Sequence, residues 1–325
     1  MHKKGIIMQN NNIVRSYLPR TDIATECVEL HFKSHPFDKD GLLTYSENIR
    51  GINCDTLEIF TDQGAEKLGK PKGKYMTFDV GQITLFARSD FERTVEVCAE
   101  KLRSLLPIGG SCLLACLGNR QISADAQGPL CAEHFIVSRH IKNLNPELFG
   151  EMDIADTMCI VPDVLGNTGV EAASVVKGIV NRMAPDYVIA VDSLAARKTA
   201  RIGCTLQMSD AGIAPGSGVG NHRTALSTET LGIPVISVGI PTVVDAVTVG
   251  ADVLEEVFAK TESKNIPDDI HRNVLRSVLE GGSYGYFVSP KNSDEISECA
   301  AKLIGMTINK ALNPHLDIAE MEELV

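Results

Sequence analysis

The sequence lacks the features of a secreted or membrane protein. Its first residues are partly basic but contain no long apolar stretch, so it predicts neither a signal peptide nor a membrane span. Positive charge is not in excess, because the formal net charge is −11. Such a balance argues against non-specific binding to nucleic acid or to an anionic membrane. We therefore expect a cytoplasmic protein with neither nucleic acid nor membrane as a direct partner.

Motifs for redox and metal chemistry are also missing. The nine cysteines are odd in number and contain no Cys-x-x-Cys pair, which indicates a reducing compartment. Cys112 and Cys116 lie on an apolar run, where packing in the core is the expected role. The eight histidines are scattered and form no His-Glu-x-x-His motif. We expect no bound metal and no cofactor.

What the sequence does contain is an alternation of short apolar runs and amphipathic stretches. The 325 residues, 44% of them apolar, suffice for one large α/β domain or two smaller ones. Expected helices cover 91–105, 127–142, 170–183, a segment from Val243 or Val244, and one from about Asp294. Expected strands cover 56–60, 75–78, 111–117, 158–161, 187–191, 204–208, 234–239 and 286–289. This alternation predicts an α/β fold with a mostly parallel twisted sheet and helices on both faces.

Composition divides the chain into three parts. The first residues, to about 26, are polar and predict a flexible leader. Residues 23–88 mix short strands with Gly and Pro and predict a β-rich segment packed on the core. Residues 89–325 predict the α/β core. The charged and then Gly-rich stretch 261–285 predicts a mobile insert in it.

Two aspartates each follow a short apolar run, and this pair carries the strongest functional signal from the residues alone. Asp125 comes after the run 112–117, and Asp192 directly follows the run 187–191. Ligands of parallel sheets bind beyond the carboxyl ends of the strands, where both aspartates fall. Of two carboxyls sharing one site, one keeps a proton while the other can activate a water. The alternative for each aspartate is a helix N-cap, and Asp125 is the better candidate for one.

A loop rich in small residues, 209–223, follows the expected strand 204–208. Its glycines Gly216, Gly218 and Gly220 let a backbone approach a ligand closely, but they do not complete the Gly-x-Gly-x-x-Gly fingerprint. A flexible surface loop is the alternative. The loops 162–169 and 239–245 have the same character, and loops after successive strands converge on one crevice.

Six ordered segments together resemble the germination proteases of endospore-forming bacteria, which degrade small acid-soluble spore proteins. The segments are Arg20-Thr-Asp-Ile-Ala-Thr-Glu26, Leu117-Gly-Asn119 with Asp125-Ala-x-Gly-Pro129, Val164-Leu-Gly-x-Thr-Gly-Val-Glu171, Ile189-Ala-Val-Asp-Ser-Leu-Ala-Ala-Arg197, Ser209-Asp-x-Gly-Ile-x-Pro-Gly-Ser-Gly-Val-Gly-Asn221 and Leu231-Gly-Ile-Pro-Val-Ile-x-Val-Gly-Ile-Pro-Thr-Val-Val-Asp-Ala246. They extend over most of the chain. The match is therefore far more specific than any single motif.

The resemblance implies a fold akin to the hydrogenase-maturation proteases and an aspartic-type mechanism with Asp125 and Asp192 as the pair. It implies a zymogen, a homotetramer, and a location in the forespore and spore core. Members cleave after an acidic residue in sequences like Thr-Glu-Phe-Ala-Ser-Glu, which Thr21-Asp-Ile-Ala-Thr-Glu26 is similar to. The resemblance therefore implies self-cleavage between Asp22 and Ile23, which would release residues 1–22 as a propeptide.

Substrate contacts are expected from a few further residues. Arg197 and Arg223 are candidates for pairing with the acidic side chain before the scissile bond, since Arg binds carboxylates in a bidentate way. Gly216, Gly218 and Gly220 belong to the loop 212–220, whose backbone N–H groups are candidates for the oxyanion site.

The chain departs from the family pattern at three places near the pair. It has Ser123-Ala124 where the family usually has Thr-Pro, Ser193 where it has Ala, and Asp163 where it has Gly. Asp163 adds a carboxylate that can alter how the pair shares its proton. Two other functions stay open: a metal-dependent peptidase of the hydrogenase-maturation type, and a non-catalytic binder of spore proteins with the same fold.

Overall fold

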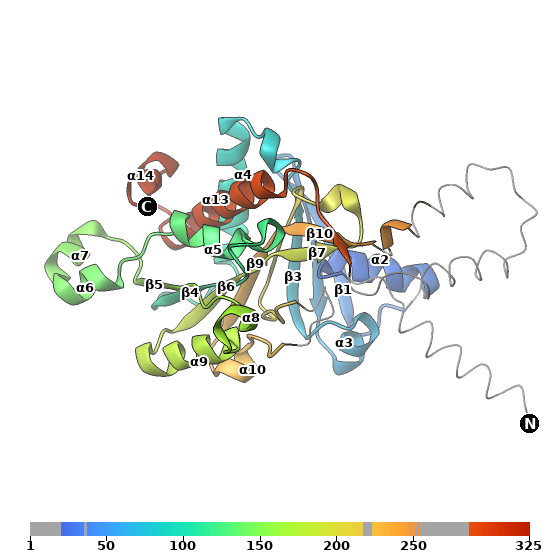
Figure 1. The fold of residues 1–325 in the computed structure, drawn as a ribbon, viewed down its shortest axis with the longest axis horizontal. Helices are drawn as coiled ribbons and strands as arrows, with labels where there is room; N and C mark the ends of the chain where they lie inside the picture. Colours follow the sequence, from blue (N-terminus) through green and yellow to red (C-terminus); the bar gives the residue numbers. More distant parts are fainter. Residues whose placement is uncertain (1–20, 36–37, 217–222, 247, 251–252, 254–285) are drawn as a thin grey trace, which may run out of the picture.

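The computed structural model describes residues 21–35, 38–216, 223–246, 248–250, 253 and 286–325. Its central feature is a sheet with helices against both faces (Figure 1). Within the described residues the sheet has eight strands in the order β1-β2-β3-β8-β9-β6-β4-β5. The strands are β1 (Leu42–Ile49), β2 (Ile52–Ile59), β3 (Gly73–Asp79), β4 (Cys112–Cys116), β5 (Thr157–Ile160), β6 (Tyr187–Val191), β8 (Thr205–Ser209) and β9 (Val235–Gly239).

Parallel pairing is confined to one half of this sheet. Strands β5, β4, β6 and β9 run parallel, and β8 joins β9 antiparallel. The N-terminal strands β1, β2 and β3 then extend the sheet by antiparallel pairs. The predicted α/β class is confirmed, and its parallel part is the part that carries both aspartates.

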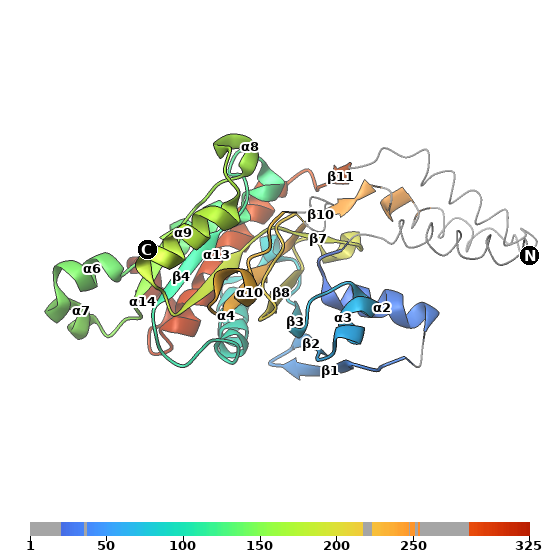
Figure 2. The same ribbon diagram turned by 90° about the horizontal axis from the view of Figure 1, so that it is seen from below.

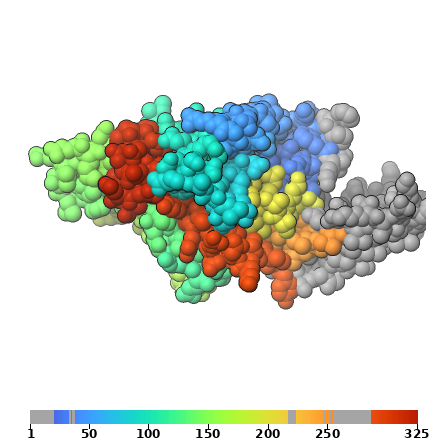
Figure 3. Space-filling model, turned by 90° about the horizontal axis from the view of Figure 1, so that it is seen from above, coloured from blue at the N-terminus to red at the C-terminus, as the bar shows by residue number. Residues whose placement is uncertain are grey.

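Alternation along β4 explains why helices cover both faces. Cys112, Leu114 and Cys116 point into one core with α4 (Arg88–Arg103) and α13 (Ser293–Leu312). Leu113 and Ala115 point to the other face, into a core with α9 (Ala172–Met183). A strand buried on both sides has no polar face, which is why its sequence is a continuous apolar run. In the space-filling view, α4 (turquoise) and α13 (orange-red) lie side by side on the face of the molecule turned to the viewer (Figure 3).

The remaining described elements lie around this core. Helices α6 and α7 extend beyond β5 at one end, and α2 and α3 lie beside β1–β3 toward the other (Figure 2). The bounds are α2 (Ala24–Ser34), α3 (Asp62–Leu68), α5 (Gln127–Cys131), α6 (Arg139–Leu144), α7 (Pro146–Met152), α8 (Leu165–Thr168), α10 (Thr228–Leu231) and α14 (Ile318–Glu323). None of the helices within the described ranges is long and apolar enough to cross a membrane.

Two predicted elements are wrong in their details. Residues 241–245 form a strand, β10 (Pro241–Asp245), rather than the start of a helix; helical backbone begins only at Ala246. Strand β10 pairs with β7 (Leu194–Ala196) and β11 (Phe287–Val288) in a small second sheet. The predicted helix 127–142 is divided into α5, a 3-10 turn and α6. The β-branched run Thr242-Val-Val244 suits a strand.

Most of the predicted leader and insert lie outside the described residues, which begin at Thr21 and omit 254–285. The few leader residues that are described are folded. Ile23 is fully buried against Leu194, Ala196 and Val244, and α2 packs through Ala24, Cys27 and Val28 on the N-terminal strands. The chain from Thr21 onward is therefore part of the packed structure.

Candidate functional site

Asp125 lies in a tight turn beyond the carboxyl end of β4. It ends a 3-10 turn at Ser123–Asp125, and its Oδ2 accepts a hydrogen bond of 2.9 Å from the backbone N–H of Asn119. Gly118 permits this turn, because its φ is +112° and a Cβ there would lie 2.2 Å from the Asp125 carbonyl oxygen. Helix α5 has Ala126 at its N-cap and receives no side-chain cap. Asp125 is therefore not the N-cap of this helix, which was the alternative role predicted for it.

Asp192 lies directly after β6 and is 5% exposed. Its Oδ1 accepts the N–H of Ser193 at 3.0 Å, and its backbone oxygen accepts a 2.8 Å hydrogen bond from the Gln127 side chain. The chain continues into strand β7 rather than a helix, so Asp192 is not a helix cap either. Gln127, which follows Asp125 by two residues, thus ties the two turns together.

The two carboxyls form one electrostatic unit. Burial raises the pKa of Asp125 to about 6, although the Asn119 N–H opposes this rise. Burial raises the pKa of Asp192 well above its usual value, and the charges of Asp125 and Asp22 raise it further. Near neutral pH this arrangement keeps a proton on Asp192 and a negative charge on Asp125.

Two charged residues adjust this pair from opposite directions. The positive charge of Arg223, a predicted substrate residue, lowers the pKa of both aspartates. The negative charge of Asp163 raises the pKa of Asp125. Asp163 adopts a φ of +60°, and its carboxylate accepts hydrogen bonds from the Val164 N–H and the Asn167 side chain.

The first described residues of the chain also lie at this site. The N–H of Asp22 donates to the Ala195 carbonyl at 2.8 Å, and the Ala195 N–H donates to the Asp22 carboxylate at 2.9 Å. The carbonyl oxygen of Asp22 accepts hydrogen bonds from Lys70 Nζ and Gln207 Nε2, both at 2.8 Å. Asp22 therefore lies beside β7. Its partner on that strand, Ala195, follows Asp192 by three residues.

A buried carboxylate anchors this segment from the other side. Glu26 is fully buried and accepts the backbone N–H groups of Arg197 at 2.7 Å and Lys198 at 2.9 Å. Arg201 Nε lies 3.3 Å from the same carboxylate. Sequence reasoning did not single out Arg201, and it proposed Arg197 for its side chain rather than for its backbone N–H.

The glycine loop is only partly described. Gly216 is its last described residue and has a φ of +71°, whereas Gly218 and Gly220 lie outside the described residues. Ile213 donates its N–H to the Leu226 carbonyl, and Ala211 donates to the Ser209 side chain. These two N–H groups are thus already bonded within the protein. The sequence Gly281-Gly-Ser-Tyr-Gly285 has the spacing of a serine nucleophile elbow, but it too lies outside the described residues.

Two cavities are lined by residues of the segments that carry the aspartates, although neither cavity is lined by Asp125 or Asp192 themselves. One of about 510 Å³ is lined by Asp22, Lys70, Gln207, Leu194 and Gly239, together with the loop that follows β8. Another of about 450 Å³ is lined by Gly118, Asn119 and Asp163. Together they provide space for a ligand beyond the carboxyl ends of the parallel strands.

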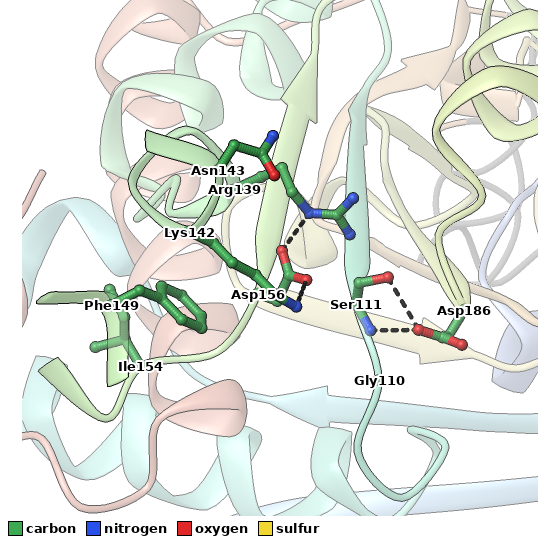
Figure 4. Close-up of a pocket in the computed structure, with 9 residues that line it drawn as sticks. All are labelled: Gly110, Ser111, Arg139, Lys142, Asn143, Phe149, Ile154, Asp156 and Asp186. Atoms are coloured by element: carbon green, nitrogen blue, oxygen red, sulfur yellow. Dashed lines mark hydrogen bonds and ion pairs between the residues drawn. The ribbon is translucent and has the colours of Figure 1, made fainter. Parts of the chain in front are cut away.

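A further cavity of about 450 Å³ opens at the opposite ends of β4, β5 and β6 (Figure 4). The charged groups that line it have partners within the protein: Arg139 and Lys142 both bind Asp156, and Ser111 donates to Asp186. Ligands of parallel sheets bind at the other edge. We therefore assign this cavity a structural role. Within the described ranges, no three His, Cys, Asp or Glu side chains are grouped to hold a metal ion.

Comparison with known proteins gives one consistent result. A sequence model of the germination protease family matches residues 22–266. A germination protease of Clostridium perfringens is 36% identical, over 95% of this chain and 99% of the relative. One of Priestia megaterium is 32% identical over 95% and 98%, and one of Bacillus velezensis is 40% identical over 85% and 76%. Among solved structures, the NiFe hydrogenase maturation protease HycI of Thermococcus kodakarensis KOD1 is 18% identical with a TM-score of 0.33, covering 64% of this chain and 98% of that one.

Proposed function

The chain belongs to the germination protease family, and we propose that it is a self-processing endopeptidase that hydrolyses peptides by a pair of aspartates. Membership of the family supports a peptidase of spore germination. The observation that carries the aspartic mechanism is the pair itself: Asp125 and Asp192 follow neighbouring parallel strands, Asp125 is partly buried and Asp192 is buried, and the charge of Asp125 raises the pKa of Asp192.

The different environments of the two carboxyls suggest their roles. Asp192 is more deeply buried and holds the proton, so it is the acid that protonates the leaving nitrogen. Asp125 is charged above about pH 6 and is the base that takes a proton from water. Water oxygen adds to the carbonyl carbon, and the C–N bond breaks as Asp192 delivers its proton. The products are one carboxyl group and one amine.

The proposed site of self-processing is the Asp22–Ile23 bond. Asp22 lies close enough to Asp192 for its charge to raise the pKa of that residue. Cleavage after Asp22 would release residues 1–22 and leave Ile23 as the new N-terminus. Since Ile23 is buried against β7 and β10, the remaining chain would keep its packing.

The proposed substrates are small acid-soluble spore proteins, cleaved after acidic residues, and the proposed assembly is a homotetramer in the forespore and spore core. Arg223 supports recognition of an acidic side chain, because it brings positive charge to the pair. We propose Arg197, Gly216, Gly218 and Gly220 as further contacts of the bound peptide.

Mass spectrometry of the protein mixed with a small acid-soluble spore protein tests this function. The wild type and Asp192→Asn are compared after mildly acidic pre-incubation. We expect new termini after acidic residues, and loss of residues 1–22, in the wild type only. Equal cleavage by both forms would refute the aspartate mechanism, and tight binding without cleavage by either would favour the non-catalytic binder. Activity that disappears after exhaustive chelation and returns with a divalent ion would favour the metal-dependent peptidase.

A further inference from the structure

We infer that Lys70 and Gln207 form the site that binds the carbonyl oxygen of the residue before the scissile bond, with Lys70 stabilising the oxyanion. This inference rests on the proposed function and adds two residues to it. Neither residue belongs to the glycine loop that sequence reasoning assigned to the oxyanion. In the folded zymogen the occupant is the carbonyl of Asp22, and in the processed protein it is the corresponding carbonyl of an acidic peptide.

The two donors converge on one atom from different parts of the chain. Lys70 Nζ and Gln207 Nε2 each lie 2.8 Å from the Asp22 carbonyl oxygen. Two hydrogen-bond donors on a single carbonyl, one of them charged, are the arrangement that stabilises an oxygen as it becomes negative. An oxyanion site requires this convergence at the carbonyl of the bond to be cleaved, and here that bond is Asp22–Ile23.

Gln207 is held so that its amide nitrogen points at this oxygen. It is 8% exposed and lies in β8 opposite Thr77 of β3. Its Oε1 accepts hydrogen bonds from the Ala24 N–H at 2.6 Å and from the Thr77 hydroxyl at 3.4 Å. With Oε1 bound to these donors, Nε2 is directed to the Asp22 carbonyl. One side chain thus holds the peptide on both sides of Ile23.

Lys70 is positioned by the end of helix α3. Gly69 ends that helix in the left-handed conformation, with φ at +63°, and the Lys70 N–H bonds back to the Ala65 carbonyl. Pro71 then fixes the chain that follows. Lys70 and Gln207 both line the 510 Å³ cavity that adjoins Asp22. After release of residues 1–22, this cavity offers the same two donors to another peptide.

A backbone N–H group of β7 explains why the site would prefer an acidic residue before the cleaved bond. The Asp22 carboxylate accepts the Ala195 N–H, and the Asp22 N–H donates to the Ala195 carbonyl. These two bonds hold residue 22 along β7 while Lys70 and Gln207 hold its carbonyl. When water adds to that carbonyl, its proton passes to Asp125 and the electron pair of the C=O bond moves to the oxygen beside Lys70. This electron pair re-forms the C=O bond as the C–N bond breaks and Asp192 protonates the Ile23 nitrogen.

Self-processing rates of the full chain test the role of Lys70. Lys70→Met removes the charged donor, and we expect the chain beginning at Ile23 to form 10²–10³-fold more slowly, on the order of the loss seen for one oxyanion donor. Lys70→Arg should restore much of the rate. The control is Lys177→Met, because Lys177 is exposed on α9 and does not line the cavity that contains Lys70. Its rate should match the wild type, and all variants should have wild-type thermal unfolding midpoints.

A second measurement uses the processed protein, beginning at Ile23, and a peptide with one acidic residue before the cleaved bond. Lys70→Met and Gln207→Met should lower kcat with little change in KM, because an oxyanion donor acts mainly in the transition state. If the wild type cleaves and Lys70→Met cleaves equally fast in both assays, the inference is wrong and the proposed function stands. If the wild type cleaves in neither assay, the proposed function fails, and this inference with it.

Discussion

A Cβ atom placed on Gly239 would lie 2.3 Å from the backbone oxygen of Asp192 and 2.8 Å from the Leu194 side chain. Strand β9 ends at Gly239, directly beside the turn that follows β6. The φ of Gly239 is not in the left-handed region, so what it supplies is space rather than conformational freedom. The same backbone oxygen receives the Gln127 side chain. Gly239 therefore sets the position of Asp192 through direct contact with its main chain.

Gly239→Ala should displace Asp192 and lower peptide cleavage at least tenfold, since small misplacements of a reacting group are costly. Gly178→Ala is the matched control, because Gly178 lies in α9 and its added Cβ would meet no atom within 4 Å. That variant should be fully active and slightly more stable. Steady-state kcat measured for both forms decides the matter, and equal values would show that the contact does not position Asp192.

The pH profile should report Asp125 as the base. Burial is the main cause of its pKa of about 6, and the charge of Asp163 adds to it. We therefore expect kcat/KM to rise with pH through about 6 and to fall again where Asp192 loses its proton. Asp163→Asn should move the acidic limb to lower pH, because it removes a negative charge near Asp125. The exposed Glu151→Gln should leave the limb in place. An unmoved limb in Asp163→Asn would contradict the assignment of Asp125.

The raised pKa of Asp125 means that its charged form should lower the stability of the fold at neutral pH. The pKa of Asp125 is raised from 3.8 to about 6, so the folded chain binds the proton more tightly than the unfolded chain does. The resulting stabilisation is complete below about pH 4 and is lost as the pH rises through 6. Asp125→Asn should therefore raise the free energy of unfolding at pH 7.5 by about 1–3 kcal/mol and change it little at pH 4.

The same experiment on Asp156 should give a change in the free energy of unfolding of the opposite sign. Its pKa is lowered, since the hydrogen bonds and charges of Arg139 and Lys142 outweigh its burial. Asp156→Asn should therefore lose stability at pH 7.5, and the loss should shrink as the pH falls below the ordinary value for aspartate. Urea unfolding of both variants at pH 7.5 and pH 4, and of Asp156→Asn and the wild type also near pH 3, checks the prediction. A loss of stability for Asp125→Asn at pH 7.5 would contradict it.

The sequence predicted the parallel strands well and the site only in part. Strand β6 was predicted at its observed bounds, and β4 and β9 within one residue, because a fully buried strand is a continuous apolar run. Asp125 and Asp192 were found for the same reason: each follows such a run. The helix expected near Val243 was wrong because pairing with β7, a contact far along the chain, determines a strand there.

Contacts between distant segments explain what was missed. Gln207 interrupts the buried run of β8, and a polar residue in such a run was the available signal for it. Lys70 offered no signal, since its partner is 48 residues away and is a backbone oxygen. Glu26 and Arg201 are likewise far apart in sequence. Their pairing depends on how α2 packs on the sheet, which local periodicity does not specify.

Glu26 should matter more to the fold than its neighbour Glu29, although both contact Arg201. Glu26 is fully buried, and its carboxylate accepts two backbone N–H groups and the Thr21 hydroxyl at 2.5 Å. Glu29 pairs with Lys198 and Arg201 at the surface, and its side chain is 41% exposed. Hydrogen bonds to a buried charge contribute more than an exposed ion pair does.

We expect Glu26→Gln to lower the free energy of unfolding by about 1.5–3 kcal/mol and Glu29→Gln by less than about 1 kcal/mol. Glu26→Gln should also slow cleavage at Asp22, because the contacts that hold Thr21 to Glu26 place Asp22 against Ala195. Denaturant unfolding and the rate of self-processing are measured on the same two variants. Equal losses of stability would contradict the anchoring role of Glu26. A loss of stability in Glu26→Gln with an unchanged processing rate would show that Asp22 is held by its own contacts with Lys70, Gln207 and Ala195, independently of the anchor.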